Sequence, residues 1–322
     1  MITRITRLII AVQLLVALLI CIALINIWHV NNVFAAFTVG IGLVILIRLT
    51  IIANNFFISL RYRSVAPEDF RLTWKQVLRL FATEFFASML SSHWTMAFCS
   101  FDKRIADRPV GLPALLIHGY GCNSGYWHSM SRLLLSEHIT HYAVDLEPVF
   151  ADIDEYAPLI DQALAQLCRE TGQEKAVIVA HSMGGLVARA YIRKYGTARI
   201  AKVITLGTPH RGTGLANFGT GLNSQQMQWQ GRAGQGKASQ WLEELEASED
   251  TAIRSLFVSI YSHHDNIISP QTSSHLAGAE NIELAGIGHV SLAMNPEVQK
   301  IVIAQIKLAS QHEASAHGSV SQ

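Results

Sequence analysis

Residues Lys175 to Tyr195 read KAVIVAHSMGGLVARAYIRKY, and this stretch decides the fold. Ala176 to Ala180 form a run of apolar, mostly β-branched residues without a polar face, which is typical of a strand buried on both sides of a parallel sheet. A helical pattern follows the turn HSMGG at 181–185, so the stretch predicts strand, tight turn and helix, with a serine in the turn. Such a sharp turn requires small residues two before and two after the serine; here they are Ala180 and Gly184.

Around this unit the chain predicts a mostly parallel sheet with helices on both faces, because strand and helix patterns alternate along it. The further strands are expected at 113–118, 141–146, 202–206, 256–261 and 281–284, and an amphipathic helix at 156–169. Ligands of such sheets bind outside the carboxyl ends of the strands, and Ser182 lies at one of these ends. In the simpler interpretation of the turn, the serine only caps the helix. The rest of the chain has to decide between this role and a functional one.

The composition of the chain argues against nucleic acid as a partner and indicates the redox state of its compartment. The 322 residues carry a formal net charge of +1, only 15% of them are charged, and no basic block indicates nucleic acid. The four cysteines form no CxxC or secretory pattern, which favours a reducing compartment; they are Cys21, Cys99, Cys122 and Cys168.

The N-terminal 55 residues predict two membrane-spanning helices, at about 8–27 and 33–52, joined as a tight hairpin. A cleaved signal peptide fits less well, because the first apolar run is too long for its core. Arg4 and Arg7 precede the hairpin, further basic residues follow it, and the link between its helices has none, so both ends are expected on the cytoplasmic side of a bacterial inner membrane. A single span, with the second run buried in the domain, would place the domain outside.

Three further segments carry expectations. Residues 73–98, in a linker expected at 56–110, form a helical pattern that fits packing on the following domain better than a place in the membrane interface. Residues 212–240 lose all periodicity, which is typical of a lid or a surface loop. The tail at 310–322 is expected to be unstructured.

The chemistry that a serine in such a turn could perform needs a base to take its proton and an acid to orient that base. His289 lies after the last expected strand, in AGIGHVSL, and Asp265 lies just past the preceding strand, in YSHHDNII. Both loops are on the side of the sheet where Ser182 projects. The sequence therefore predicts a triad of Ser182, Asp265 and His289.

Other candidates for the base and the acid fit less well. His181 adjoins the serine, so its side chain should point away, and His263 and His264 precede the acid in the chain. Asp145 ends an earlier strand, before the serine. His118 and His210 belong to loops that other roles explain better.

A developing oxyanion needs two preorganised backbone donors. Met183, the residue after the serine, supplies one, and Tyr120 in the loop IHGYGCN after the first strand is expected to supply the other. The motifs HGYG, AHSMGG, LGTPHRGT, HHDNIISP and GIGHVSL, in this order over about 111–308, resemble the bacterial triacylglycerol lipase and esterase group of the α/β-hydrolase superfamily. Ala180 replaces the commoner glycine of the group.

The resemblance implies an α/β-hydrolase catalytic domain at 111–309 that cleaves carboxylic esters, including lipids, through an acyl-enzyme and without an organic cofactor. No metal site is assigned and calcium dependence stays open, because no ligand pattern can be recognised. Acyl transfer or thioester cleavage at the same triad remains an alternative, as does a membrane scaffold that has kept the fold without catalysis.

Overall fold

A seven-stranded sheet lies at the centre of the computed structural model, which describes residues 1–232 and 235–320. Its order is β1-β3-β2-β4-β5-β8-β9, and every neighbouring pair is parallel except the edge pair of β1 and β3. The strands are β1 Lys103–Arg104, β2 Ala114–Ile117, β3 His141–Val144, β4 Ala176–His181, β5 Ile200–Leu206, β8 Phe257–Ser262 and β9 Glu280–Leu284. The predicted mostly parallel sheet is confirmed, and all six predicted strands are present.

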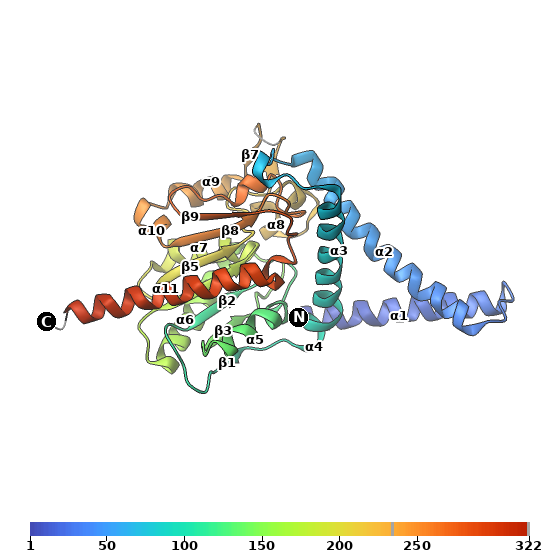
Figure 1. Ribbon diagram of the computed structural model, residues 1–322, viewed down its shortest axis with the longest axis horizontal. Helices are drawn as coiled ribbons and strands as arrows, with labels where there is room; N and C mark the ends of the chain where they lie inside the picture. Colours follow the sequence, from blue (N-terminus) through green and yellow to red (C-terminus); the bar gives the residue numbers. More distant parts are fainter. Residues whose placement is uncertain (233–234, 321–322) are drawn as a thin grey trace.

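The strands alternate their side chains between two apolar cores because successive residues of a strand point to opposite faces. Ile178 and Ala180 of β4 belong to one core, and Val177 and Val179 belong to the other. Helices α6 (Ala157–Thr171) and α7 (Met183–Tyr195) cover the first face, and α5 (His128–Ser136) and α11 (Pro296–Val320) cover the second (Figure 1). Both faces are closed, as the unbroken apolar run of β4 requires.

Smaller elements complete the domain. They are the helices α8 (Leu222–Gln226), α9 (Gln240–Ala247) and α10 (Thr251–Ser255), and a separate two-stranded sheet of β6 (Trp229–Gln230) and β7 (Lys237–Ala238). The segment 212–240, expected to be irregular, holds in its described residues, 212–232 and 235–240, only such short elements and a 3₁₀ turn at Gly214–Phe218. It lies next to the N-terminal region, since the ring of Tyr62 packs directly against Gly214.

Two long N-terminal helices, α1 (Ile2–Asn26) and α2 (Val33–Tyr62), extend away from the sheet and converge toward the link between them (Figure 1). Both are long and apolar enough to cross a membrane, and little of their surface is buried. Small residues line their contact: a methyl group on Gly40 would lie 2.6 Å from the carbonyl oxygen of Ala17. Helix α1 starts about six residues before the predicted first span and ends close to its end, whereas α2 starts at the predicted residue and continues about ten residues past the predicted span.

Helix α3 (Trp74–Leu90) lies between this pair and the sheet, and continues through a π-helical turn into α4 (Met96–Phe98) (Figure 1). It packs on the domain, as predicted, through its buried residues Leu80, Glu84 and Ala87. The opposite side remains exposed: Trp74 is 68% and Phe86 is 69% accessible.

The prediction of an unstructured tail from Ser310 is wrong for the residues that the structure describes. Helix α11 continues to Val320, and residues 321–322 lie outside the described range. The hydroxyl of Ser310 accepts a hydrogen bond from Leu112 N (2.9 Å), and Glu313 forms an ion pair with Lys175 (2.8 Å). These two contacts attach the helix to the sheet, which composition alone does not reveal.

Helix α7, which follows the serine, is fixed by a buried ion pair. The Arg189 guanidinium binds both carboxylate oxygens of Glu249 (2.6 and 2.8 Å) and also donates to the carbonyl of His210 (3.0 Å). Both side chains of the pair are almost fully buried. A bidentate pair of this kind holds the helix at one rotation relative to its neighbours.

We expect Glu249→Gln to lower the free energy of unfolding by about 3 to 5 kcal/mol, because it leaves the buried Arg189 charge without its partner. Glu243→Gln is the matched control: Glu243 pairs with Lys237 at 3.5 Å, and both side chains are exposed. The control should change the value by about 0 to 1 kcal/mol. Urea unfolding in detergent micelles measures both, and equal losses would contradict the assignment.

Candidate active site

Ser182 occupies the turn between β4 and α7 in a strained backbone conformation, with φ 55° and ψ −126°. A methyl group on Gly184 would lie 2.4 Å from the carbonyl oxygen of Ile117, and one on Gly185 would lie 2.1 Å from Oγ1 of Thr208. Neighbouring strands therefore leave no room for side chains here. The sharp turn with small neighbours, predicted from the sequence, is present.

Hydrogen bonds from the adjacent strand hold this conformation. Ser182 N donates to Leu206 O at the end of β5 (2.9 Å), and Ser182 O accepts from Thr208 Oγ1 (2.9 Å). The serine is 7% exposed. It is thus fixed at the carboxyl end of β4 and directly beside the end of β5.

The loops after β8 and β9 bring Asp265 and His289 together. His289 Nδ1 lies 2.8 Å from Asp265 Oδ2. Since a carboxylate only accepts hydrogen bonds, Nδ1 carries the hydrogen, and Nε2 of the neutral imidazole is the nitrogen that can accept a proton. The other carboxylate oxygen accepts from Ile267 N (2.8 Å) and Ile268 N (2.7 Å), which fixes the orientation of Asp265. This acid and base pair is the one that chain order predicts.

Burial by itself lowers the pKa of His289, but the nearby Asp265 carboxylate, its hydrogen bond and the charge of Glu84 outweigh this effect and raise the pKa. The balance stabilises the protonated imidazolium, the form that a general base passes through during a reaction.

The pair lies over the end of β5, next to the strand of the serine. A methyl group on Gly207, the first residue after β5, would lie 3.1 Å from Asp265 Oδ2 and 3.3 Å from His289 Nδ1. Within the described residues, Ser182 Oγ makes no hydrogen bond to His289. Catalytic hydrogen bonds are often long in the free enzyme and shorten when a substrate binds.

The loop after β2 lies against the serine from the other side. A methyl group on Gly119 would lie 2.8 Å from Ser182 Cβ. In the described part of the chain, the backbone N–H groups of Tyr120 and Met183 donate no intramolecular hydrogen bond. The Tyr120 side chain points elsewhere, because its hydroxyl donates to Thr220 O (2.8 Å) in the segment 212–240.

The competing histidines have structural partners. His181 Nε2 donates to the carbonyl of His289 (3.0 Å), so its side chain supports the histidine loop, and burial keeps its pKa well below the usual value. His118 accepts from Leu146 N (3.1 Å), and His263 pairs with Glu283 (2.7 Å). His210 lies 3.2 Å from the Thr205 hydroxyl.

The remaining two candidates also lie outside the Asp265–His289 pair. His264 is buried, which lowers its pKa to about 4. Asp145 accepts from Ser124 N (2.6 Å) and does not contact His289.

Sequence reasoning missed two residues that contact the histidine loop. Asn266 Oδ1 accepts from His289 N (3.0 Å), and Glu84 of α3 accepts from Val290 N (2.9 Å) and Ser291 N (3.0 Å). A signal for Glu84 exists in the sequence, because it is the single acidic residue of the apolar helix at 74–90. Nothing local indicates its partner, which lies more than 200 residues further on.

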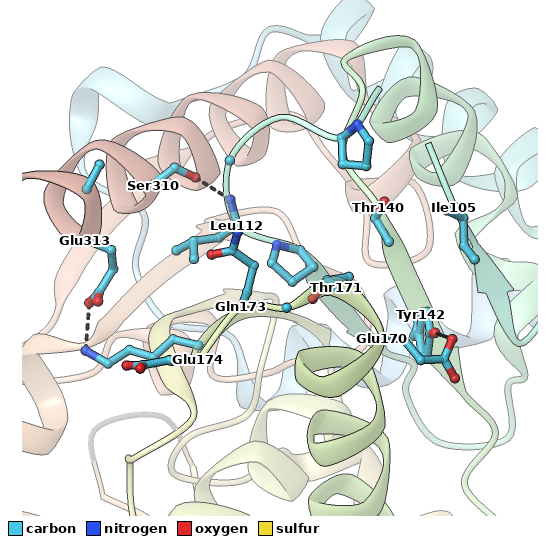
Figure 2. Close-up of a pocket in the computed structure, with 16 residues that line it drawn as sticks. Ile105, Leu112, Thr140, Tyr142, Glu170, Thr171, Gln173, Glu174, Ser310 and Glu313 are labelled. Carbon is cyan, nitrogen blue, oxygen red and sulfur yellow. Dashed lines mark hydrogen bonds and ion pairs between the residues drawn. The ribbon is translucent and has the colours of Figure 1, made fainter. Parts of the chain in front are cut away.

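A cavity of about 600 Å³ lies at the opposite end of the strands (Figure 2). Leu112, Thr140 and Lys175, which precede β2, β3 and β4, line it together with Ser310 and Glu313 of α11. Parallel sheets bind their ligands at the carboxyl ends, so this cavity is not the candidate active site. A second cavity, of about 510 Å³, lies between α2 and α3 and reaches Asp265.

No group of three or more histidine, cysteine, aspartate or glutamate side chains within 1–232 and 235–320 is arranged to hold a metal ion.

A serine in a strained strand-to-helix turn at the edge of a mostly parallel sheet with helices on both faces is typical of the α/β-hydrolase fold. Residues 114–294, more than half of the chain, match the Alpha/beta hydrolase family, and the protein belongs to this family. The mature form of the Bacillus licheniformis lipase BlEst2 shares the fold with a TM-score of 0.54 at 14% identity, over 64% of this chain and 97% of that one.

Curated relatives match over a shorter region. The chain is 32% identical over 115 residues to a triacylglycerol lipase of Pseudarthrobacter phenanthrenivorans, covering 33% of this chain and 35% of that protein. A triacylglycerol lipase of Burkholderia plantarii matches at the same identity, over 33% of this chain and 32% of its own length. A pimeloyl-[acyl-carrier protein] methyl ester esterase of Vibrio cholerae is 28% identical over 30% of this chain and 37% of its own. The chain therefore spans about a third of the length of these relatives.

Proposed function

We propose that this protein is a membrane-anchored carboxylic ester hydrolase whose catalytic triad is Ser182, Asp265 and His289. The observation that carries the proposal is the 2.8 Å contact between Asp265 and His289, at the sheet edge where Ser182 lies in its strained turn. The similarity to lipases and to an esterase supports the same class of reaction.

In the proposed mechanism, Ser182 Oγ attacks the ester carbonyl while His289 Nε2 takes its proton. Asp265 keeps the imidazole in the tautomer with hydrogen on Nδ1 and stabilises the imidazolium. His289 then gives the proton to the departing alcohol, which leaves an acyl-enzyme on Ser182. A water molecule, deprotonated by the same histidine, releases the acid and restores the serine.

The backbone N–H groups of Met183 and Tyr120 are proposed as the oxyanion donors. Both are free of intramolecular partners in the described residues. Gly119, next to Tyr120, lies so close to the serine that an added methyl group would be 2.8 Å from Ser182 Cβ. Donors that point at the developing charge before the reaction need no rearrangement during it.

The proposed substrates are esters with apolar acyl groups, including lipids. The cavity between α2 and α3 supports this class, because mainly apolar side chains line it and Asp265 borders it; they include Phe56, Phe57, Leu60, Val77 and Leu80. The segment 212–240 is proposed as a lid. Tyr120 of the loop after β2 binds it at Thr220, and Tyr62 of α2 packs against it at Gly214.

The hairpin of α1 and α2 is proposed to span the bacterial inner membrane twice, with the catalytic domain in the cytoplasm. Arg4 and Arg7 precede the first span, Arg61 and Arg63 follow the apolar part of the second, and the link at 28–32 has no basic residue. The four cysteines are all free thiols, which fits a reducing compartment.

Ser182→Ala should lower the turnover of p-nitrophenyl esters by roughly 10⁶-fold, because no other group can form the acyl-enzyme. Assays of p-nitrophenyl esters with a series of acyl-chain lengths, with and without micelles, measure both the loss of turnover and the substrate preference. Equal turnover by the variant would refute the enzyme assignment. A preference for short soluble esters, without gain at micelles, would indicate an esterase rather than a lipase.

Asp265→Asn should lower kcat by about 10⁴-fold, because an amide does not hold His289 in the tautomer that accepts from Ser182. Asp145→Asn is the matched control and should leave kcat close to that of the unchanged protein, since its oxygen can still accept from Ser124 N. Steady-state kinetics decide between the two, and reversed losses would move the acid to Asp145.

Green fluorescent protein fused to the C-terminus of the full chain should fluoresce, because two spans return the chain to the cytoplasm. Alkaline phosphatase fused at the same place should be inactive for the same reason. Fusions truncated after Asn31, in the link between the helices, should give the opposite result and serve as the control. Strong phosphatase activity at the C-terminus would indicate a single span and an exported domain.

A further inference from the structure

A buried carboxylate connects α3 to the loop of the candidate catalytic histidine. Glu84 is 1% exposed, on a helix whose other side carries the exposed Trp74 and Phe86. Its Oε1 accepts from Val290 N (2.9 Å) and its Oε2 accepts from Ser291 N (3.0 Å). Both donors belong to the backbone directly after His289.

The loop fits closely around this carboxylate. A methyl group on Gly288 would lie 2.4 Å from Glu84 Oε2, so position 288 has no space for a side chain. Asn266 Oδ1 binds His289 N, and His181 binds His289 O, so the backbone on both sides of the imidazole is held. Of the three residues that hold this loop, Asn266 and His181 belong to the sheet and its loops, whereas Glu84 belongs to helix α3.

Burial of a carboxylate costs free energy, and folding stability alone would favour an apolar residue here. Burial raises the pKa of Glu84, while its two backbone hydrogen bonds act in the opposite direction. An amide could not replace it, because a glutamine offers one oxygen to two N–H donors and would turn its own NH₂ toward the other. A buried carboxylate at this position therefore points to a task that an apolar side chain cannot perform.

We infer that Glu84 is a positioning residue for His289: it fixes the loop from helix α3, so the N-terminal region completes the active site rather than only anchoring it. The inference rests on the proposed function. Three titratable groups from different elements lie near the imidazole, namely Asp265 after β8, Glu84 on α3 and His181 on β4. Tyr126, after β2, stacks on His181 and donates to the carbonyl of Val290 (3.1 Å). Asp265 and Glu84 are the acidic ones, and both raise the pKa of His289.

Glu84→Gln and Glu84→Ala in the full chain should lower kcat by about 10²-fold with little change in KM, because a misplacement of about 1 Å has this effect. The acid limb of the kcat/KM profile should also move to lower pH, since a carboxylate near the imidazole stabilises its protonated form and its removal lowers the pKa of His289. Glu84→Gln keeps the volume of the side chain and serves where Glu84→Ala does not fold.

Two controls separate positioning from stability. Glu313→Gln removes a carboxylate that pairs with Lys175 at the opposite end of the strands from the site, so it should lower stability yet keep kcat per folded molecule and the acid limb. Thr83→Ala changes the exposed residue beside Glu84 and should change neither kcat nor the acid limb of the pH profile. Circular dichroism at each pH gives the folded fraction to which the rates are normalised.

The inference is overturned if folded Glu84→Gln keeps kcat within threefold and an unchanged acid limb. It is also overturned if the loss of kcat per folded molecule in Glu84→Gln equals that in Glu313→Gln. Ser182→Ala is measured in the same assay: activity retained there refutes the proposed function itself, whereas an inactive Ser182→Ala with fully active Glu84 variants refutes only the role of Glu84.

Discussion

The strained backbone at Ser182 is the constraint on which the rest of the site depends. A residue with φ 55° and ψ −126° stays in that conformation only when its surroundings leave no alternative. Here the end of β5 holds both of its backbone polar groups, through Leu206 and Thr208. The end of β2 and its loop approach the turn so closely that Gly119 and Gly184 cannot carry side chains, and Thr208 after β5 excludes one at Gly185. The turn thus depends on the whole parallel sheet, and not on its own five residues.

The N-terminal region contacts several of the loops that surround this turn. Thr3 of α1 accepts from Asn123 in the loop after β2 (2.9 Å), and the carbonyl of Ser59 in α2 accepts from Ser269 after β8 (2.8 Å). Glu84 of α3 binds the loop after β9. The candidate active-site edge of the sheet therefore faces the helices that are apolar enough to span a membrane. In the proposed membrane-anchored arrangement, an apolar substrate that leaves the bilayer would reach this edge of the sheet first.

The sequence predicts the sheet because buried parallel strands are continuous apolar runs, and β4 is such a run on both faces. It also predicts the contact between Asp265 and His289, since consecutive strands of a parallel sheet end at one edge. It does not predict the helix beyond Ser310, because contacts with Leu112 and Lys175 stabilise a segment of polar composition. Local patterns contain no information on such distant partners.

Glu84 shows the same limit in a functional residue. An isolated carboxylate in an apolar helix is visible in the sequence, but its meaning depends on two backbone N–H groups, and backbone groups leave no mark on residue types. Gly288 is the partial exception, since its missing side chain makes room for the Glu84 carboxylate. A glycine next to a candidate catalytic histidine can therefore indicate that another part of the chain approaches there. The identity of that part follows only from the fold.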